Sequence, residues 1–461
     1  MHTELTGEEV AAAPETSFLG HPRGLAYLAF TQVWERFSYY GMQALLALYM
    51  IHQLLLPGHV ENVIGFAGFR TVVEAVFGPL TTLALASQIF GLYTGFIYMT
   101  PLLGAWLGDR ILGQRRTSVL GLLLMAAGHL LMASEAGFLV ALLFLLIGAG
   151  CVKGNMYAQV GELYRAGDPR RTQAFSIYLI GLNVGAFFAP LVCGTLGELY
   201  GWHYGFGVAG IGMLIGVATY LSGWRYLPVD RRRTDATAVR LDRADWRAIF
   251  AILLTLLPPI LIYAATNQAY NIVIVWAEAS VDRSMFGLTF PVTWFLTWDG
   301  LMTIVGIAVT IPLWRALSAR RREPDTLVKL SMGGALTAAA YLLLAAGTSV
   351  FALVPAAVVL LYFLLFDFAF AWTDPPTNSF VSRFAPSSVA STMMRLNLMI
   401  AFGVPNIAVG WLGRFYEPLG PARFWLLHAG IAAAGSVLAL SLRPYVRRLL
   451  AGRIGGEGAK L

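Results

Sequence analysis

The chain has 461 residues, of which 57% are apolar and only 12% are charged, and its mean hydropathy is +0.67. Soluble domains carry about 25% charged residues, so this composition excludes an ordinary soluble protein and predicts a polytopic membrane protein. The formal net charge of +7 is explained below by the placement of basic residues between membrane spans, and it requires no nucleic-acid partner.

Twelve membrane spans are predicted. Runs of about 20 apolar residues, enough to cross a hydrocarbon core of about 30 Å, are centred near residues 40, 92, 124, 148, 186, 214, 262, 302, 336, 362, 401 and 432. A soft border around Ser134 to Phe138 leaves eleven or thirteen spans open. The expected fold class is therefore an all-α integral membrane protein with twelve transmembrane helices in two six-helix halves.

A basic segment after the sixth span divides the chain into those halves. We predict a cytoplasmic N-terminal tail over 1–24, a six-helix bundle over 25–226, a basic cytoplasmic linker over 227–247, a second six-helix bundle over 248–443 and a cytoplasmic C-terminal tail over 444–461. The connection over 57–79 is predicted to be extracytoplasmic and to hold a surface-lying helix. Two such halves around a midplane site are the layout of a secondary transporter.

The basic residues set the predicted orientation. With both termini in the cytoplasm, most of the 32 Lys and Arg fall on the cytoplasmic side, as the positive-inside rule requires. We therefore expect a plasma-membrane protein, in bacteria an inner-membrane protein, whose basic face also meets anionic lipid head groups. The exceptions are Arg70, Arg283, Arg414 and Arg423 on the opposite side, and Arg36 and Lys153 within spans.

Two ionisable residues, Glu35 and Arg36, stand inside the first span in the string WERFSYYG. Each costs on the order of 3 kcal/mol at the bilayer centre, so such residues face a bundle interior or a water-filled path. The simpler interpretation is an internal ion pair that only locks helices together. Tyr39, Tyr40 and Gln43 share one broad helical face with the pair, which favours a pocket over packing alone.

A second dense string, GAWLGDRILGQRR, lies between spans two and three. Gly104 and Gly108 allow close helix approach, and Asp109 can pair with an arginine or cap the next helix. The string resembles the gating-loop signature of the major facilitator superfamily. Its three arginines are Arg110, Arg115 and Arg116.

Three further strings narrow the resemblance to the proton-dependent oligopeptide transporter family of that superfamily. WERFSYYGM is similar to the ExxER-F-x-YYG signature, AFSIYLIGLNVGAFFAP over 174–190 resembles the span-five signature, and Lys153-Gly154-Asn155 resembles a Lys-Pro-Asn string in span four. The resemblance covers nearly the whole chain and is tighter in the first half. It implies proton-coupled uptake of small peptides by alternating access.

The resemblance also implies roles for site residues. Arg36 and Lys153 would meet a substrate carboxylate, tyrosines would line the pocket, and Asn183 would hydrogen-bond a peptide backbone. The full set of substrate-binding candidates is Arg36, Tyr39, Tyr40, Tyr98, Lys153, Asn183, Tyr263, Asp299, Asp367 and Asn397.

The chain departs from the family pattern at several amides. Gln32 stands where the first glutamate of ExxER is expected, Gln43 replaces an arginine, and Asn267 replaces the glutamate that partners it. Loss of both charges of this ion pair avoids leaving one buried charge without a partner, which would cost several kcal/mol. We therefore expect a gate closed by hydrogen bonds between amide side chains. In span eleven Asn397 replaces a pocket tryptophan, and Arg395 lies close by toward the cytoplasm as a gate residue.

The second half carries unexpected carboxylates. Phe370 takes the place of a glutamate that receives a peptide amino terminus, whereas Asp367 and Asp374 lie on the same helical face around it and span eight adds Asp299. An unpaired carboxylate in apolar surroundings holds a proton more readily than in water. The proton-coupling candidates are therefore Glu35, Asp299, Asp367 and Asp374.

Alternatives stay open for these acids. Asp374 can instead pair with Arg395, and Asp367 with Lys153, as structural ion pairs. Asp367 can also be a displaced amine site, and the substrate can be a non-peptide acid or a modified peptide.

We therefore predict a secondary active transporter that couples protons to symport of di- or tripeptides or a related small carboxylate-bearing substrate. The alternatives are a proton-independent facilitator or exporter of non-peptide metabolites or drugs and, more remotely, a non-transporting ligand sensor. An enzyme is not expected, because the sequence has no HExxH and no GxSxG string. We expect no metal and no cofactor, the proton as coupling ion, membrane lipids as partners and function as a monomer. Cys151 and Cys193 indicate no disulfide.

Overall fold

Helices make up almost all of the computed structural model, which describes residues 16–165, 167–230, 241–285 and 287–453. Ten helical segments within these ranges are long and apolar enough to cross a membrane. The other two predicted spans coincide with α1 (Arg23–Tyr49) and α5 (Gln114–Leu131), whose hydropathy is lowered by charged residues such as Arg36 and Arg115. The predicted all-helical membrane fold is confirmed.

The first half consists of helices with short strands before them. Its elements are β1 (Thr16–Phe18), β2 (His21–Pro22), α1, η1 (Met50–Leu54), η2 (Val60–Asn62), α2 (Phe66–Phe77), α3 (Thr82–Phe96), α4 (Thr100–Leu107), η3 (Gly108–Leu112), α5, η4 (Glu135–Gly137), α6 (Phe138–Glu162), α7 (Arg170–Ala189), η5 (Pro190–Gly194), α8 (Thr195–Tyr200), α9 (Trp202–Ser222) and η6 (Trp224–Tyr226).

The second half is also helical, and its short strands lie between helices. Its elements are α10 (Arg243–Thr266), η7 (Asn267–Tyr270), α11 (Ile272–Ser280), β3 (Val281–Asp282), β4 (Ser284–Met285), β5 (Leu288–Thr289), α12 (Trp294–Ala319), α13 (Thr326–Val350), β6 (Val354–Pro355), α14 (Ala356–Phe384), η8 (Ser387–Val389), α15 (Ala390–Leu398), η9 (Met399–Gly403), α16 (Val404–Gly413), α17 (Tyr416–Leu419) and α18 (Pro421–Leu450). The strands form three two-stranded ribbons: β1 with β2 and β4 with β5 are antiparallel, and β3 with β6 is parallel.

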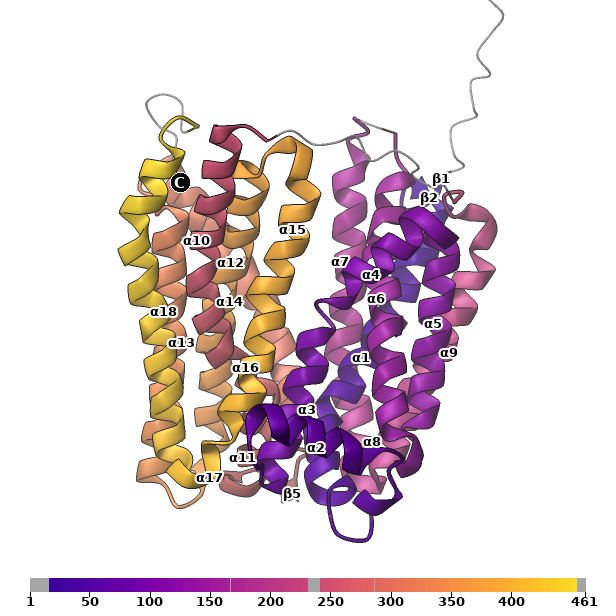
Figure 1. Ribbon diagram of the computed structural model, residues 1–461, viewed down its shortest axis with the longest axis vertical. Coiled ribbons are helices and arrows are strands. Elements are labelled where there is room, and N and C mark those ends of the chain that lie inside the picture. Colours follow the sequence, from indigo (N-terminus) through magenta and orange to yellow (C-terminus); the bar gives the residue numbers. More distant parts are fainter. Residues whose placement is uncertain (1–15, 166, 231–240, 286, 454–461) are drawn as a thin grey trace, which may run out of the picture.

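Two helical bundles stand side by side, one from each half of the chain (Figure 1). In the first, α1 packs on α7 and α9, and α5 packs on α6; in the second, α13 packs on α14 and α18, and α10 packs on α18. The bundles meet chiefly where α3 packs on α16 and where α7 packs on α12. The predicted linker between them lies largely outside the described residues.

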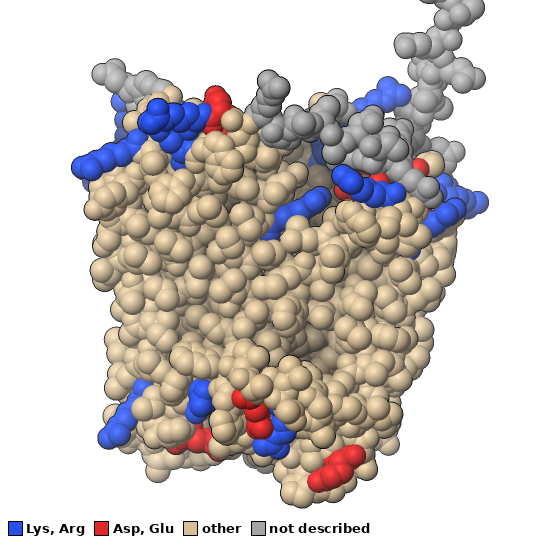
Figure 2. Space-filling model, viewed as in Figure 1, with Lys and Arg blue, Asp and Glu red and all other residues tan. Residues whose placement is uncertain are grey.

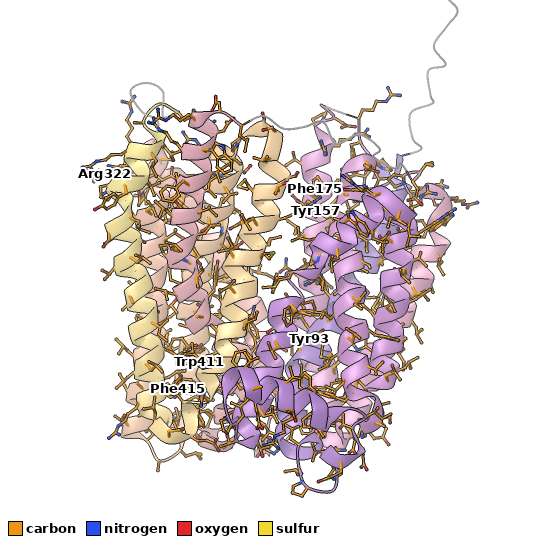
Figure 3. The ribbon with its side chains drawn as sticks, viewed as in Figure 1. Tyr93, Tyr157, Phe175, Arg322, Trp411 and Phe415 are labelled. Atoms are coloured by element: carbon orange, nitrogen blue, oxygen red, sulfur yellow. The ribbon has the colours of Figure 1, made fainter. Side chains whose placement is uncertain are left out.

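Charged side chains gather at the two ends of the molecule, and an uncharged band separates them (Figure 2). We call the end that carries β1, β2 and Arg322 the basic end, and the end that carries α2, α11 and α17 the distal end. In Figure 3 Arg322 lies at the basic end, as does the contact between the Tyr157 and Phe175 rings, whose centroids are 4.6 Å apart. Helix α2 runs across the distal end, which confirms the predicted surface helix.

The second half departs from the predicted boundaries at its C-terminus. Helix α18 continues to Leu450, beyond the predicted start of the tail at residue 444. The extension is stabilised because Arg443 Nε and Arg447 Nη2 lie 2.7 and 2.8 Å from a carboxylate oxygen of Asp325. Asp325 is itself the N-cap of α13, where it accepts a hydrogen bond from the Val328 amide.

Candidate functional site

A cavity of about 500 Å³ lies between the two bundles. Side chains of α1 and α7 line it from the first half, and side chains of α12 and α14 from the second. The predicted site residues that line it are Tyr39, Tyr40, Gln43, Tyr98, Asn183, Asn267, Asp299, Asp367 and Asp374. Asn183 donates its amide hydrogen to the Leu179 carbonyl 2.8 Å away. Arg36, Lys153, Tyr263 and Asn397 were also predicted to contact substrate, but they lie behind this lining.

The charges of the first span are paired with one another. Arg36 Nε lies 2.6 Å from Glu35 Oε2, and both side chains are buried. Gln32 donates to Glu35 Oε2 at 3.1 Å and accepts a hydrogen bond from the Tyr178 hydroxyl. An amide suits this position, because one side chain must donate to a carboxylate and accept from a phenol at once.

Lys153 lies between two tyrosine rings. Its Nζ is 4.9 Å from the ring centroid of Tyr39 and 4.8 Å from that of Tyr98, and both rings line the cavity. The predicted alternative pair with Asp367 is absent, and within the described ranges Lys153 makes no ion pair with any carboxylate. Cation–π contacts hold the ammonium without neutralising it, so its charge remains available to an anion in the cavity.

Two carboxylates of the second half, Asp299 and Asp367, share an arrangement. The Tyr270 hydroxyl donates to Asp299 Oδ2 at 2.8 Å, and the Thr303 hydroxyl donates to Asp367 Oδ1 at 2.6 Å. The second oxygen of each, Oδ1 of Asp299 and Oδ2 of Asp367, is buried and has no hydrogen-bond partner among the described residues.

Asp374 has a different environment. Asn378, one turn later on α14, donates to Asp374 Oδ2 at 3.0 Å, and Asn397 donates to Asn378 Oδ1 at 2.6 Å. The predicted alternative pair between Asp374 and Arg395 does not form among the described residues: Asn378 bonds to one oxygen of the carboxylate, and Arg395 is exposed on α15. Asn397 therefore supports the cavity wall through Asn378 instead of facing a substrate.

The predicted amide gate is also absent in this conformation. Gln43 Oε1 and Asn267 Nδ2 are both buried without a hydrogen-bond partner among the described residues. Both residues line the cavity, so neither closes it. Tyr263, by contrast, is held in packing, with its ring centroid 4.6 Å from that of Phe402 and its hydroxyl donating to Thr373.

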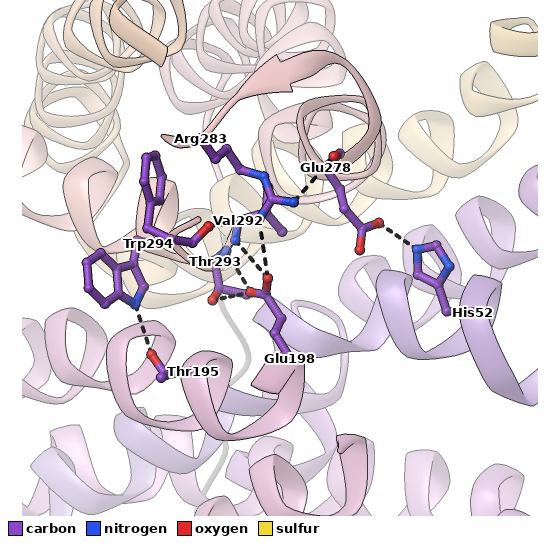
Figure 4. A network of polar contacts seen from close by, with 9 residues as sticks. His52, Thr195, Glu198, Glu278, Arg283, Val292, Thr293 and Trp294 are labelled. Atoms are coloured by element: carbon purple, nitrogen blue, oxygen red, sulfur yellow. Dashed lines mark hydrogen bonds and ion pairs between the residues drawn. The ribbon is translucent and has the colours of Figure 1, made fainter. Parts of the chain in front are cut away.

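The distal end is closed by polar contacts between the halves, shown in Figure 4. Glu198 at the end of α8 accepts hydrogen bonds from the Val292 amide at 2.8 Å, the Thr293 amide at 3.0 Å and the Thr293 hydroxyl at 2.6 Å. Arg283 Nη1 lies 3.8 Å from the same carboxylate. We call the polar contacts that join the two halves at this end the distal seal.

Further contacts complete the distal seal. His52 Nε2 lies 2.5 Å from Glu278 Oε2, and Trp294 Nε1 donates to the Thr195 hydroxyl at 2.8 Å. Asn271, which follows the break in span seven, donates to Ser87 Oγ of α3 at 2.6 Å.

The basic end is not sealed in this way. Among the described residues, the hydrogen bonds and ion pairs that join the halves all lie toward the distal end. The cavity lining extends toward the basic end as far as Asn378 and Leu398, and the bundles diverge there in Figure 1. Among the described residues, the contacts that close the cavity therefore lie on its distal side.

The string between spans two and three braces the first half internally. A Cβ at Gly104 would overlap the Gly150 carbonyl, and one at Gly108 would overlap the Asn155 side chain, so both glycines let their helix lie directly on α6. Asp109, expected to pair with an arginine or to cap the next helix, does neither among the described residues: Asp230 accepts a hydrogen bond from the Arg115 amide at 2.7 Å instead. Arg115 also donates to the Leu227 carbonyl, whereas Arg110 and Arg116 are exposed.

Sequence reasoning missed several residues that build the site. Tyr270, Thr303 and Asn378 hold the three aspartates, and Glu198 and His52 belong to the distal seal. A signal was present for Glu198, which is an acid within a predominantly apolar segment. The partners of the aspartates carry no such signal, because hydroxyl and amide side chains are common in any helix.

Two packed bundles with a cavity between them, which polar contacts between the halves close on the distal side, define a membrane transporter that works by alternating access. The chain belongs to the Major Facilitator Superfamily, whose family model matches residues 28–409.

Similar proteins place it more narrowly. The chain is 29% identical over 398 residues to a di-/tripeptide transporter of Lactococcus lactis, covering 72% of this chain and 76% of that one. It is 26% identical to the peptide transporter YePEPT of Yersinia enterocolitica, covering 96% and 98%. A crystal structure of a mutant of the peptide transporter POT in complex with alafosfalin has a TM-score of 0.83 at 25% identity, covering 95% and 98%. These likenesses confirm the resemblance to the oligopeptide transporters that the motifs indicate.

Proposed function

We propose that this protein is a proton-coupled symporter that imports small zwitterionic substrates, with di- and tripeptides as the leading class. The observation that carries the proposal is the separation of charge across the cavity: Lys153, which makes no ion pair among the described residues, lies against the Tyr39 and Tyr98 rings that line the first-half wall, and the carboxylate of Asp374 lines the second-half wall. A zwitterion matches that separation of charge. The relatives named as di-/tripeptide transporters support the same class.

The orientation follows from charge. We assign the basic end to the cytoplasm by the positive-inside rule, so the described conformation faces inward and the distal seal closes the outer side. We place the protein in the bacterial plasma membrane, working as a monomer with the proton as coupling ion and no cofactor. Import then consists of opening the distal seal, loading the cavity and releasing substrate toward the basic end.

Two groups would hold the substrate. Lys153, backed by Arg36, would bind the carboxylate, and Asp374 would bind the ammonium group, because its second oxygen is free of the Asn378 hydrogen bond. A cavity of about 500 Å³ lies within the range of roughly 300–1,000 Å³ typical of small-molecule sites.

Uptake of labelled dialanine into proteoliposomes tests the function. We expect accumulation above the outside concentration with an inward proton gradient, and only equilibration when a protonophore collapses it. Equilibration that is the same with and without the gradient would instead show a facilitator. No uptake by protein that is folded and inserted would exclude dialanine and contradict the peptide assignment.

Replacing Asp374 with asparagine tests the amine site. We expect the KM for dialanine to rise roughly 10–100-fold, because a hydrogen bond to a charged group contributes about 1.5–3 kcal/mol. The affinity for N-acetylated dialanine, measured by competition, should change little. An equal loss for both compounds would show that Asp374 acts on the cavity shape and not on the ammonium group.

A further inference from the structure

Asp299 and Asp367 form a unit that the substrate contacts do not explain. They come from neighbouring helices, α12 and α14, and Thr303, one turn after Asp299 on α12, donates to Asp367. In each carboxylate, one oxygen accepts a single hydrogen bond from a hydroxyl group. The other oxygen is buried and has no hydrogen-bond partner among the described residues. These two oxygens are buried although both residues line the cavity.

Among the described residues, no cation forms an ion pair with either acid. The titratable groups that interact with Asp299 are Tyr270 of η7, Tyr40 of α1, Tyr362 of α14 and Asp367 itself. None of these brings positive charge, and within the described ranges no lysine or arginine forms an ion pair with either acid. Burying an isolated carboxylate costs far more than burying a neutral carboxyl group, and two together cost more still.

A single proton held by the pair accounts for both the unpartnered buried oxygens and the missing positive charge. A protonated carboxyl group is neutral, and it carries an O–H donor on an oxygen that would otherwise be a buried, unpartnered acceptor. It also leaves the pair with one negative charge instead of two, as when two neighbouring carboxylates share a site. The two hydroxyl donors, Tyr270 and Thr303, then suffice for the remaining charge.

We propose that Asp299 and Asp367 are a carboxyl dyad that holds the coupling proton of this transporter. The inference rests on the proposed proton-coupled function and moves the proton away from the first span. There Gln32 removes one acid, and Arg36 keeps Glu35 in an ion pair.

The dyad is also placed to act on the distal seal. Tyr270, which donates to Asp299, is the last residue of η7, where span seven breaks. The next residue, Asn271, has an irregular backbone (φ −122°, ψ −101°) and donates to Ser87 across the halves. Loss of the proton adds a charge beside the Tyr270 hydroxyl and tightens that hydrogen bond. Protonation weakens the hydrogen bond between Tyr270 and Asp299. This bond lies at the break in span seven, next to the contact between Asn271 and Ser87 in the distal seal.

Infrared difference spectroscopy on protein labelled with ¹³C-aspartate detects the proton on the dyad. Wild-type protein should show the carbonyl band of a protonated aspartate that disappears as the pH is raised. Asp299→Asn and Asp367→Asn should each abolish this band. Asp282→Asn is the matched control and should keep it, because hydrogen bonds from Ser284 lower the pKa of the exposed Asp282 and keep it ionised. A band whose frequency and pH dependence are the same as in the wild type in both dyad variants overturns the proposal.

Transport measurements then test whether the dyad couples proton movement to substrate movement. In both dyad variants we expect gradient-driven accumulation of dialanine to fall at least tenfold while counterflow of dialanine, which needs no net proton movement, is retained. Retained counterflow also shows that the variants fold. Accumulation equal to wild type in both variants would overturn the dyad. If wild-type protein shows neither accumulation nor counterflow, the proposed function fails, and the infrared band still decides whether the dyad holds a proton.

Discussion

Replacing Lys153 with alanine is expected to raise the KM for dipeptides with a free carboxylate roughly 10–100-fold. The ammonium group lies against Tyr39 and Tyr98 without an ion pair among the described residues, so a substrate anion is the partner that its charge lacks. A hydrogen bond to a charged group contributes about 1.5–3 kcal/mol, and each 1.4 kcal/mol is a factor of ten in affinity. Uptake kinetics in proteoliposomes measure the change.

The specificity of that loss separates recognition from packing. A dipeptide amide, which has no carboxylate, should compete equally well against the wild type and the Lys153→Ala variant. Lys329→Ala is the control for loss of a cation–π contact outside the cavity, because Lys329 Nζ lies 4.6 Å from the ring centroid of Trp314, although Lys329 also pairs with Glu323. If the free acid and the amide lose affinity equally, Lys153 holds the two tyrosines in place and does not bind the carboxylate.

The fold was largely predictable from the sequence because the membrane enforces it. Long apolar runs must become helices in lipid, since every backbone polar group needs a partner within its own segment. The approximate positions of the spans followed from this rule. It failed at the end of α18, where the interaction of Arg443 and Arg447 with Asp325 extends the helix beyond its apolar core.

The site was predictable where one helix or one motif carries it. Glu35, Arg36, Tyr39 and Tyr40 share a helix, and their proximity follows from helical spacing alone. The roles of the second-half acids did not follow, because they depend on which hydroxyl or amide side chain faces each one. Asp367 is held by Thr303 of another helix, whereas Asp374 is held by Asn378 of its own.

The gate shows the same limit. Gln43 and Asn267 were expected to bond because both replace charged residues, yet in this conformation neither finds the other. The contacts that do close the distal end join segments far apart in sequence, such as Glu198 with Thr293. A gate is a property of one conformation, and a sequence must serve both the open and the closed one.

Replacing Glu198 with alanine is expected to open the distal side. Its carboxylate accepts three hydrogen bonds from the opposite half, two of them from backbone amides that would otherwise lack this partner. Loss of even one such charge-assisted bond, at about 1.5–3 kcal/mol, shifts the equilibrium between inward- and outward-facing states roughly 10–100-fold. We would measure this as the rate at which a membrane-impermeant thiol reagent, added on the distal side, labels a cysteine at Ala44, which lines the cavity. Both natural cysteines are buried, so background labelling is low.

Glu135 provides the control, because it is also a distal carboxylate with three donors. Gln53 at 2.8 Å, His59 at 2.6 Å and Asn62 at 3.1 Å all bond to it, but all three belong to its own half. Glu135→Ala therefore removes the same kind of network without breaking a contact between halves, and it should leave labelling at position 44 near the wild-type rate. Faster labelling in both variants would mean that any loss of carboxylate bonding loosens the distal end. Faster labelling in Glu198→Ala alone would show that the free energy of the closed state resides in bonds between the halves.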